Sequence, residues 1–264
     1  RKKTKMTTDI HKLLEELKLR DARAVIDETL RLAQKNKPSY STFLLDLLRR
    51  EHEGQRNRAT ASRIRRSGLR EFWALETFPF HIQKCVNKRA IYELAELDFI
   101  ARGESLVFVG QPGVGKSGLA SGIVLKALYA GHRCLAISAQ NLFAAMKESH
   151  YDRTTRHFFQ RLSRLDALLI DELGYLNTPE PQQINDFFRL MDDRCNRKST
   201  IITTNLGFEE WGKFISNGPL AAALISRLLQ KCKTIDFPKD AVNLRNPKLG
   251  LPSTAPKPGI LDAA

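Results

Sequence analysis

The chain has 264 residues, 42% of them hydrophobic, which is enough for a sizeable core and more than a single small domain needs. Its 43 Lys and Arg residues exceed its 29 Asp and Glu residues, for a net charge of +14. This excess favours a polyanionic partner such as nucleic acid, although an ordinary basic surface would give the same total. The charge is concentrated at one end, because residues 1–70 hold 19 Lys and Arg but only 9 Asp and Glu.

Cysteine and histidine spacing gives no support for a zinc site or a redox dithiol, since the four cysteines and six histidines are scattered along the chain. We expect reduced intracellular thiols. No apolar stretch approaches the ~20 residues of a membrane span, because Arg227 interrupts the apolar run of residues 220–229. The first residues also lack a signal-peptide pattern. We therefore expect a cytoplasmic protein without membrane contact.

The N-terminal part shows helical periodicity. Leucines at helical spacing predict two short helices before Pro38, and a longer helix follows from Ser41, which we take as its N-cap. The first half of that helix is apolar and the second half is rich in arginine, so its far end cannot be core. We expect a small, basic, all-helical domain over residues 1–67 and a linker over residues 68–80.

The pattern changes to alternating strands and helices over residues 81–237. After a helix at 88–97, short apolar runs predict strands at 104–110, 133–138, 167–172, 199–205 and 233–237, with helical segments between them. This alternation predicts an α/β fold whose five-stranded parallel sheet is covered by helices on both faces. The proline-containing residues 238–264 predict an extended or disordered tail.

The stretch GQPGVGKSG matches the pattern G-x-x-x-x-G-K-[ST], and it lies between a predicted strand and a predicted helix. Its glycines let main-chain N–H groups converge on phosphate oxygens at the positive end of the helix. The lysine would contact the β- and γ-phosphates, and the serine hydroxyl would bind Mg²⁺. A chance match is the alternative, which the flanking strand and helix disfavour. The predicted phosphate-binding residues are Gly110, Gln111, Pro112, Gly113, Val114, Gly115, Lys116, Ser117 and Gly118.

Polar residues end two of the predicted strands. We assign Asp171 to Mg²⁺ and Glu172 to the attacking water, although an apolar strand ending in two acids is, taken alone, an ordinary solvated strand end. Asn205 is expected to contact the γ-phosphate or to orient the water; otherwise it is a turn residue before Gly207. Hydrolysis is favoured over transfer to a small molecule, because no acceptor pocket is visible. Arg227 is our candidate for stabilising charge on the γ-phosphate, with a structural arginine paired to an acid as the equal alternative.

Four stretches together carry a family resemblance: GESLVFVGQPGVGKS, LLIDELGYL, STIITTNLGFEEWG and GPLAAALISRLL. They resemble the IstB type of transposition helper ATPase, a branch of the AAA+ superfamily near the replicative helicase loaders. The likeness covers roughly residues 10–240, including the N-terminal LLEELKLRDAR. It implies an AAA+ P-loop core that binds ATP and Mg²⁺. It also implies a homo-oligomer that assembles on double-stranded DNA and delivers it to a cognate transposase.

The same resemblance implies roles for particular residues. Arg227 looks like the finger that one subunit supplies to a neighbour's nucleotide, and Phe78 and Phe80 look like the lead-in that packs near the adenine. The two helices of residues 139–165 resemble the insertion of initiators and loaders, which drives spiral assembly and faces DNA. One departure concerns the region after Phe237, where there is no room for the usual helical lid, so the lid's sensor arginine has no counterpart that we can name.

Two groups of arginines are candidates for contacting DNA. Arg153, Arg156 and Arg164 fall near one side of the helix predicted at 153–165, where a solvated basic face is the alternative. The better candidates crowd the long N-terminal helix, where they repel one another unless an anion offsets them. No base-reading motif is present, so binding should depend on salt and little on DNA sequence. The members of the better group are Arg56, Arg58, Arg63, Arg65 and Arg66.

The sequence thus predicts an ATP-dependent transposition regulator that oligomerises on target DNA, hydrolyses ATP and delivers the DNA to its transposase. The runner-up is a replicative helicase loader, which would share the core and hold a helicase subunit with its N-terminal domain. A hypothesis of a different class is a non-hydrolysing scaffold, in which the nucleotide only locks the assembly.

Overall fold

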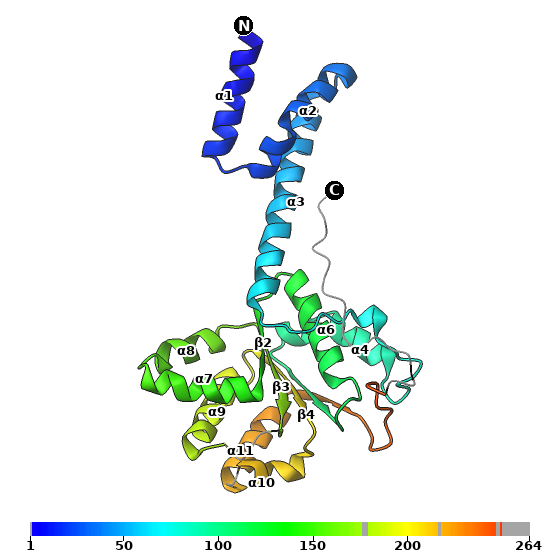
Figure 1. Cartoon of the computed structure of the whole chain (residues 1–264), viewed down its shortest axis with the longest axis vertical. Coiled ribbons are helices and arrows are strands. Elements are labelled where there is room, and N and C mark those ends of the chain that lie inside the picture. Colours follow the sequence, from blue (N-terminus) through cyan, green and yellow to red (C-terminus); the bar gives the residue numbers. More distant parts are fainter. Residues whose placement is uncertain (1, 176–178, 216–217, 247–248, 250–264) are drawn as a thin grey trace. The chain divides into compact units, whose positions relative to one another are not determined.

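A computed structural model of the chain describes residues 2–175, 179–215, 218–246 and 249 (Figure 1). The chain divides into two compact units, Arg1–Ser62 and Arg63–Ala264. Within the described residues, no helix has both the length and the apolar character needed to cross a membrane.

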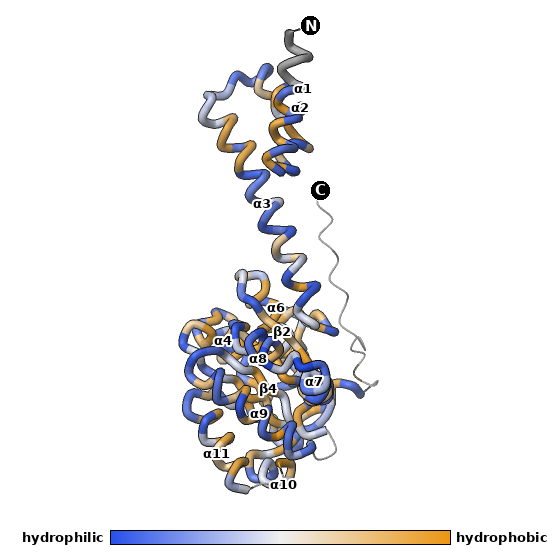
Figure 2. Tube along the Cα trace, turned by 90° about the vertical axis from the view of Figure 1, so that its left-hand side faces the viewer, coloured by the Kyte–Doolittle hydropathy of each residue, from blue (hydrophilic) through white to orange (hydrophobic). Residues whose placement is uncertain are grey.

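The first unit consists of helices, as the sequence predicts. They are α1 (Lys2–Glu16), α2 (Arg20–Asn36) and the larger part of α3 (Tyr40–Arg66). Their small core contains Leu14, Ile26 and Leu47. The buried carboxylate of Glu51 accepts hydrogen bonds from the N–H groups of Asp21 and Ala22, so it caps the start of α2. Figure 2 shows the apolar beginning of α3 giving way to a hydrophilic second half.

The N-cap of α3 differs from the sequence prediction. The helix begins at Tyr40, and the hydroxyl of Ser39 accepts a hydrogen bond of 3.1 Å from the N–H of Thr42. Ser39 is therefore the capping residue, and the prediction of Ser41 is wrong. Serines lie on both sides of Tyr40. Pro38 cannot continue the preceding helix, so the new helix starts soon after it and Ser39, the first serine, becomes the cap.

The second unit is built on a five-stranded sheet, which confirms the predicted α/β fold. Its strand order is β2-β3-β4-β1-β5, and each neighbouring pair is parallel. Since all strands run in one direction, their carboxyl ends meet at a single edge, where open α/β sheets bind ligands. The strands are β1 (Ser105–Val109), β2 (Cys134–Ser138), β3 (Ala167–Leu173), β4 (Ser199–Thr204) and β5 (Cys232–Asp236).

Successive residues of a strand point to opposite faces of the sheet, so a strand with apolar residues at every position needs a cover on both faces. Helices supply that cover. Leu106 and Phe108 of β1 are completely buried in one core, and Val107 between them is completely buried in the other. The first core includes α4 (Lys88–Ala95), α5 (Asp98–Ala101) and α6 (Lys116–Tyr129). The opposite face carries α7 (Ala139–Tyr151), α8 (Thr155–Ser163), α9 (Pro181–Arg194), α10 (Trp211–Ile215) and α11 (Gly218–Leu229) (Figure 1).

Residues 68–80 are not a free linker, contrary to the sequence prediction. Leu69, Leu75 and Phe78 are buried in the core beside α6, and residues Leu75–Thr77 form a turn of 3-10 helix, η1. Leu75 fits there because Gly122 of α6 has no side chain; a Cβ at that glycine would lie 2.6 Å from Leu75 Cδ2. Burying the apolar side chains of this stretch stabilises the fold, and a solvated linker would leave them exposed to water.

Part of the predicted C-terminal tail is also packed. Residues 238–246, which we name the C-terminal strap, follow β5, and the N–H of Leu244 donates a backbone hydrogen bond of 2.8 Å to the carbonyl of Gly113 in the glycine-rich loop after β1. The prolines and polar residues that suggested disorder do not prevent this, because a backbone hydrogen bond holds the strap to the loop and its apolar residues Ala241 and Leu244 pack against the core. Of the rest of the predicted tail, Leu249 is described, and residues 247–248 and 250–264 lie outside the described residues.

Candidate nucleotide site

The glycine-rich loop Gly110–Gly115 joins the carboxyl end of β1 to the start of α6. Because β4 lies between β1 and β3 in the sheet, the ends of β4 and β3 are next to the loop. The structure therefore brings Lys116 and Ser117 together with Asp171, Glu172 and Asn205. The N-terminus of α6, a helix of 14 residues, faces this edge with its free N–H groups and positive dipole end.

Gly115 cannot be replaced by another residue without strain. Its φ of 102° lies in the left-handed region, and a Cβ there would lie 2.7 Å from Cε2 of Phe78. Phe78 thus contacts the loop directly. Phe80 packs edge-on against Phe78, with ring centroids 4.7 Å apart, and its ring lies 6.2 Å from that of Tyr92. Of the two phenylalanines expected near the adenine, Phe78 is the one placed against the loop.

Lys116 folds back over the loop. Its Nζ donates to the carbonyl oxygens of Gly110 at 2.7 Å and Gln111 at 2.8 Å. Burial lowers the pKa of Lys116 from 10.5 to about 8, and the negative charge of Asp171 opposes that shift. An ammonium group that is held in a buried loop by two neutral carbonyls is well prepared to exchange them for phosphate oxygens.

Ser117 and Asp171 meet as the sequence predicts for a Mg²⁺ pair. The hydroxyl of Ser117 donates to Oδ1 of Asp171 at 2.8 Å. A hydroxyl and a carboxylate are hard oxygen donors of the kind that Mg²⁺ prefers, and Mg²⁺ commonly takes one or two protein ligands and completes its shell with phosphates and water. The donor set therefore fits the ion.

Thr203 is part of the site, although the sequence analysis did not identify it. Its hydroxyl donates to Oδ1 of Asp171 and accepts a 2.9 Å hydrogen bond from the backbone N–H of Glu172. One side chain of β4 thus holds both acids at the end of β3. The sequence marks Thr203 only as one of two adjacent threonines in an apolar strand. Such pairs also occur in strands that carry no functional site.

Glu172 has an unusual backbone. Its φ is 60°, and the register between β3 and β4 shifts between Ile170 and Leu173, so the strand bulges there. The bulge takes Glu172 out of the ladder and leaves its side chain exposed. A non-glycine residue in this conformation costs of order 1–3 kcal/mol, and such strain concentrates at functional sites.

Asn205 follows β4 directly, beside Gly174. Its Oδ1 is buried and has no hydrogen-bond partner among the described residues. Leaving a buried acceptor unpaired costs about 1–3 kcal/mol, so a group that binds here regains that energy. This property distinguishes Asn205 from an ordinary turn residue, whose side chain would bond to its own backbone.

Arg227 does not lie at the glycine-rich loop. It forms an ion pair with Asp192, and its guanidinium carbon lies 5.8 Å from the centroid of the Phe188 ring. The chain after Arg227 reaches Lys231, whose carbonyl accepts from the N–H of Ser105 at the amino end of β1. Arg227 is therefore near the amino edge of the sheet, whereas the loop starts about 16 Å away at the other end of five-residue β1.

The arginines of α3 do not form one uniform group. Arg58 forms ion pairs with Asp21 and Glu51, and the Nε of Arg63 donates to the carbonyl of Leu128. Arg58 thus has its anions within the chain, so the repulsion argument does not apply to it. The exposed members of the group that remain as candidates are Arg56, Arg65 and Arg66.

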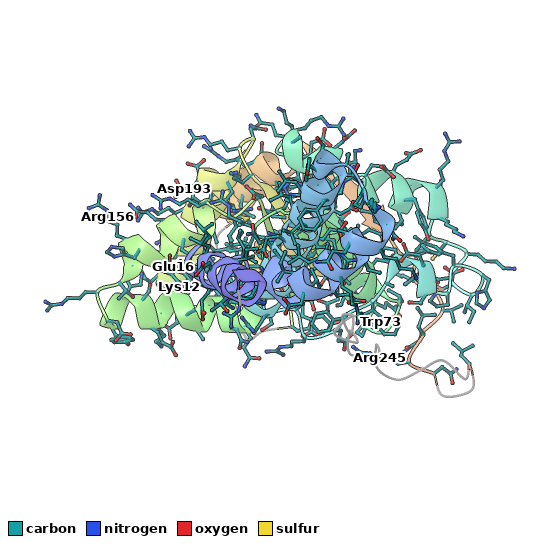
Figure 3. The ribbon with its side chains drawn as sticks, turned by 90° about the horizontal axis from the view of Figure 1, so that it is seen from above. Lys12, Glu16, Trp73, Arg156, Asp193 and Arg245 are labelled. Carbon is teal, nitrogen blue, oxygen red and sulfur yellow. The ribbon has the colours of Figure 1, made fainter. Side chains whose placement is uncertain are left out.

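The arginines around α8 also differ from the sequence prediction. Arg153 lies outside the helix, in the turn after α7, with a φ of 55°. It does not share a helical face with Arg156, because a left-handed residue ends the helical path. Arg156 belongs to α8 and projects outward from it (Figure 3), and Arg164 is the residue at which α8 ends. All three are exposed.

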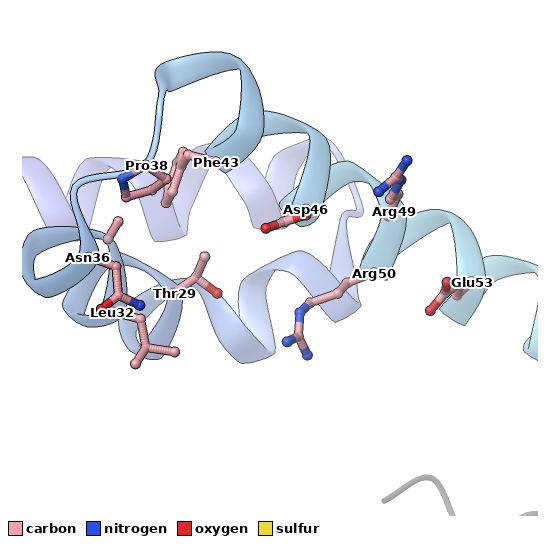
Figure 4. Close-up of a pocket in the computed structure, with 10 residues that line it drawn as sticks. Thr29, Leu32, Asn36, Pro38, Phe43, Asp46, Arg49, Arg50 and Glu53 are labelled. Atoms are coloured by element: carbon pink, nitrogen blue, oxygen red, sulfur yellow. The ribbon is translucent and has the colours of Figure 1, made fainter.

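A separate cavity of about 610 Å³ lies in the N-terminal unit, between α2 and α3 (Figure 4). Asp46 and Glu53 line it together with Arg49 and Arg50. Since its acids balance its arginines, the cavity has no positive bias toward phosphates.

The comparisons with known proteins agree with this site. Residues 12–249 match the family described as IstB-like ATP binding protein. The chain belongs to this family. This IstB-like protein is 32% identical over 237 residues to an IS21 insertion-sequence ATP-binding protein of Pseudomonas aeruginosa, covering 90% of this chain and 89% of that protein. It is 31% identical over 211 residues to an IS5376 ATP-binding protein of Geobacillus stearothermophilus, covering 80% and 84%. It is thus an ATP-binding, transposition-associated protein of the ATPase class.

Solved structures show the same fold. The DnaC helicase loader superimposes with a TM-score of 0.50 at 23% identity, covering 57% of the IstB-like chain and 88% of DnaC. AMPPCP-bound DnaA from Aquifex aeolicus gives a TM-score of 0.50 at 22% identity, covering 63% of this chain and 49% of DnaA. The IstB-like chain thus spans about half the length of DnaA. At these identities the likeness concerns the AAA+ fold alone.

Proposed function

We propose that this IstB-like protein binds double-stranded DNA largely independently of sequence, oligomerises on it with ATP and Mg²⁺, and delivers it to a cognate transposase in the cytoplasm. ATP hydrolysis resets the assembly. The observation that supports this most directly is the cluster at the end of the sheet, where Ser117, Asp171 and Thr203 share one carboxylate oxygen beside the bulged Glu172. A protein that merely used nucleotide as a lock would not need a strained acid at this position.

The geometry supports the following roles within one subunit. Main-chain N–H groups of residues 113–118 and the ammonium of Lys116 bind the phosphates, and Phe78 supports the loop from beneath. Ser117 and Asp171 would hold Mg²⁺, whose charge would offset the negative charge of the phosphates. Glu172 is the general base for the attacking water, and Asn205 orients that water or the γ-phosphate. Thr203 positions both acids.

The position of Arg227 supports the proposed oligomer. Since this residue cannot reach the phosphates of its own subunit, a catalytic arginine at this place must serve the nucleotide of a neighbour. Arg227 is half-exposed and bound to Asp192, so it would exchange that carboxylate for a phosphate on assembly. In an ATP-dependent array, each site would then be completed by the next subunit.

The test is the size of the assembly. Purified protein is examined by light scattering and electron microscopy with ATP, Mg²⁺ and duplex DNA together, and with each of the three omitted. We expect large DNA-bound assemblies only with the full mixture. Lys116→Ala is the matched variant, because it removes the phosphate contact and leaves the residues of the N-terminal unit unchanged, and it should neither bind nucleotide nor assemble.

Two results would contradict the proposal. Unchanged particle size in the full mixture would exclude ATP-dependent assembly on DNA. Recovery of a replicative helicase and no transposase from cell extracts would favour the helicase-loader hypothesis, which the shared AAA+ fold does not distinguish.

A further inference from the structure

Gln83 is a buried polar side chain that lies outside the glycine-rich motif and contacts its loop. It is 1% exposed, and its Nε2 donates to the carbonyl of Val114 in the loop at 2.8 Å and to the carbonyl of Val242 in the C-terminal strap at 2.9 Å. Its Oε1 accepts from the N–H of Val242 at 3.3 Å and from the thiol of Cys85 at 3.3 Å. Both donor hydrogens and both acceptor lone pairs of the amide are therefore used, which holds it in one orientation.

The hydrogen bond to Val114 fixes the direction of one peptide plane in the loop. The carbonyl of Val114 and the N–H of Gly115 belong to the same planar unit, and in a trans peptide they point in opposite directions. No peptide bond among the described residues is cis. Because Gln83 holds the carbonyl, the N–H of Gly115 points away from Gln83. Within the described part of the chain, no group accepts a hydrogen bond from this N–H.

The strap fixes the preceding peptide plane in the same way. The N–H of Leu244 donates to the carbonyl of Gly113, so the N–H of Val114 points away from the strap. Gln83 bonds to the same strap at Val242, so the side chain and the strap together support the loop from one side. Two successive carbonyls of the loop bond to this support, and the two N–H groups of the same peptide planes point away from it.

The loop depends on such a support because its glycines restrain it little. Gly113 and Gly115 have φ values of 83° and 102°, and glycine adopts either sign of φ at little cost. The peptide plane between Val114 and Gly115 can therefore reverse if nothing holds its carbonyl. Gly115 is left-handed and Lys116 begins α6, a combination in which successive N–H groups converge on an anion. Reversal of the plane would remove the N–H of Gly115 from that group.

We propose that Gln83 is a positioning residue for nucleotide binding, whose amide turns the N–H of Gly115 toward the phosphates. Gln83 does not touch the nucleotide; it acts through the peptide plane whose carbonyl it holds. The proposal rests on the phosphate site of the proposed function and adds to it a residue 31 positions before Val114 in the chain. The alternative is a purely structural hydrogen bond, which would stabilise the fold and leave the nucleotide affinity of the folded protein unchanged.

The test observes the amide of Gly115 by NMR in the full chain, without DNA. Labelling the carbonyl carbon of valine and the nitrogen of glycine selects Val–Gly pairs, and the chain has two, Val109–Gly110 and Val114–Gly115. The probe is ADP with Mg²⁺ at saturation. The Gly115 signal should shift downfield, because its N–H donates a charge-assisted hydrogen bond to a phosphate. Gly110 is the internal reference, since its N–H donates to the carbonyl of Thr204 and should shift less.

Two substitutions of Gln83 remove its donor. Gln83→Met keeps a similar length without hydrogen bonds, and Gln83→Glu keeps an acceptor for the N–H of Val242 but has no N–H for the carbonyl of Val114. In both variants the Gly115 signal should shift less than in wild type, even at saturating ADP. Equilibrium titration should show affinities for ATP and ADP that are each about tenfold weaker, the usual loss for one charge-assisted contact. The two losses should be alike, because the main-chain N–H groups of such a loop contact the α- and β-phosphates, which both nucleotides carry.

Ser199→Ala is the matched control for a purely structural hydrogen bond. Ser199 is completely buried at the start of β4, and its hydroxyl donates to the carbonyl of Phe99 at 3.1 Å. Like Gln83→Met, this change leaves a backbone carbonyl without its side-chain donor. It should lower the temperature of thermal unfolding but leave the nucleotide affinity and the Gly115 shift at their wild-type values.

A Gly115 amide that does not move when ADP binds to the wild type would overturn the inference. Wild-type affinity in both Gln83 variants would also overturn it, and so would weaker binding with a full Gly115 shift, because Gln83 would then act through another group. Since neither DNA nor transposase is present, these outcomes are independent of the assembly test. The expected Gln83 effects without assembly on DNA would leave this inference standing and remove the proposed function; assembly without the Gln83 effects would do the reverse.

Discussion

Glu172 adopts a backbone conformation that costs free energy, and the neighbouring strand maintains it. The hydrogen bond from its N–H to Thr203 and the shift in register place its carboxylate outside the sheet next to Asp171. We expect Glu172→Gln to bind ATP with unchanged affinity, because the side chain is exposed and the change keeps its size. Hydrolysis should fall 10²-fold or more, since an amide cannot accept the proton of the attacking water. Phosphate release in the presence of DNA measures this.

The control for this residue is Glu209→Gln, which makes the same chemical change at an exposed position of the 3-10 helix η2 (Phe208–Glu210). Its hydrolysis rate should match that of the wild type. Normal turnover by Glu172→Gln would remove the acid from the mechanism and support the non-hydrolysing scaffold.

At the scale of elements, Asp166 joins the amino ends of three strands. Asp166 directly precedes β3. Its carboxylate accepts a hydrogen bond of 2.7 Å from Nζ of Lys198, which directly precedes β4, and one of 2.9 Å from the N–H of Arg133, which directly precedes β2. Burial alone would raise the pKa of Asp166, but these hydrogen bonds outweigh burial and hold the pKa far below its ordinary 3.8. The ionised carboxylate therefore stabilises the fold above about pH 4, and this contribution is lost as the pH falls toward the folded-state pKa.

Asp166→Asn should lower the free energy of unfolding by about 1–2 kcal/mol at pH 7, because it removes a charged acceptor of two hydrogen bonds. The difference from wild type should shrink below pH 4, where the unfolded wild-type carboxylate takes up its proton. Urea unfolding at pH 7, 5 and 3 measures this. Asp152→Asn, at an exposed position after α7, should change stability little at any of these pH values. A difference for Asp166→Asn that is as large at pH 3 as at pH 7 would contradict the assignment.

The five strands and the loop could be predicted from sequence because their signals are local. Short apolar runs, the glycine pattern before Lys116 and the two acids after Ile170 are each contained in fewer than ten residues. Thr203, Gln83 and the strap could not be predicted this way. Gln83 binds Val242 across 159 residues, and nothing in either local sequence marks the pair. Arg153 was misplaced for a related reason, since a left-handed turn residue interrupts an apparently continuous helical pattern.

At the scale of the whole molecule, carboxylates of the same chain neutralise part of the positive charge. Residues 1–70 hold 19 of the 43 Lys and Arg residues. Arg58 is offset by two carboxylates, so it adds little to an external field. Exposed arginines without such partners release counterions when they meet phosphates, and each such contact contributes about 0.9 to the slope of log affinity against log salt. The salt dependence of DNA binding therefore measures how many arginines reach the DNA.

Replacing Arg56, Arg65 and Arg66 of α3 by glutamine should lower that slope by about 2–3 and weaken binding equally on unrelated DNA sequences. The comparison is a second triple variant, in which Arg156, Arg161 and Arg164 of the α8 region become glutamine. It removes the same charge from a surface with a different position in the fold. If the α8 variant lowers the slope and the α3 variant does not, the DNA contact lies on the α8 region. Titrations with duplex DNA at several salt concentrations distinguish the two surfaces, because a loss of net charge alone would weaken both variants alike.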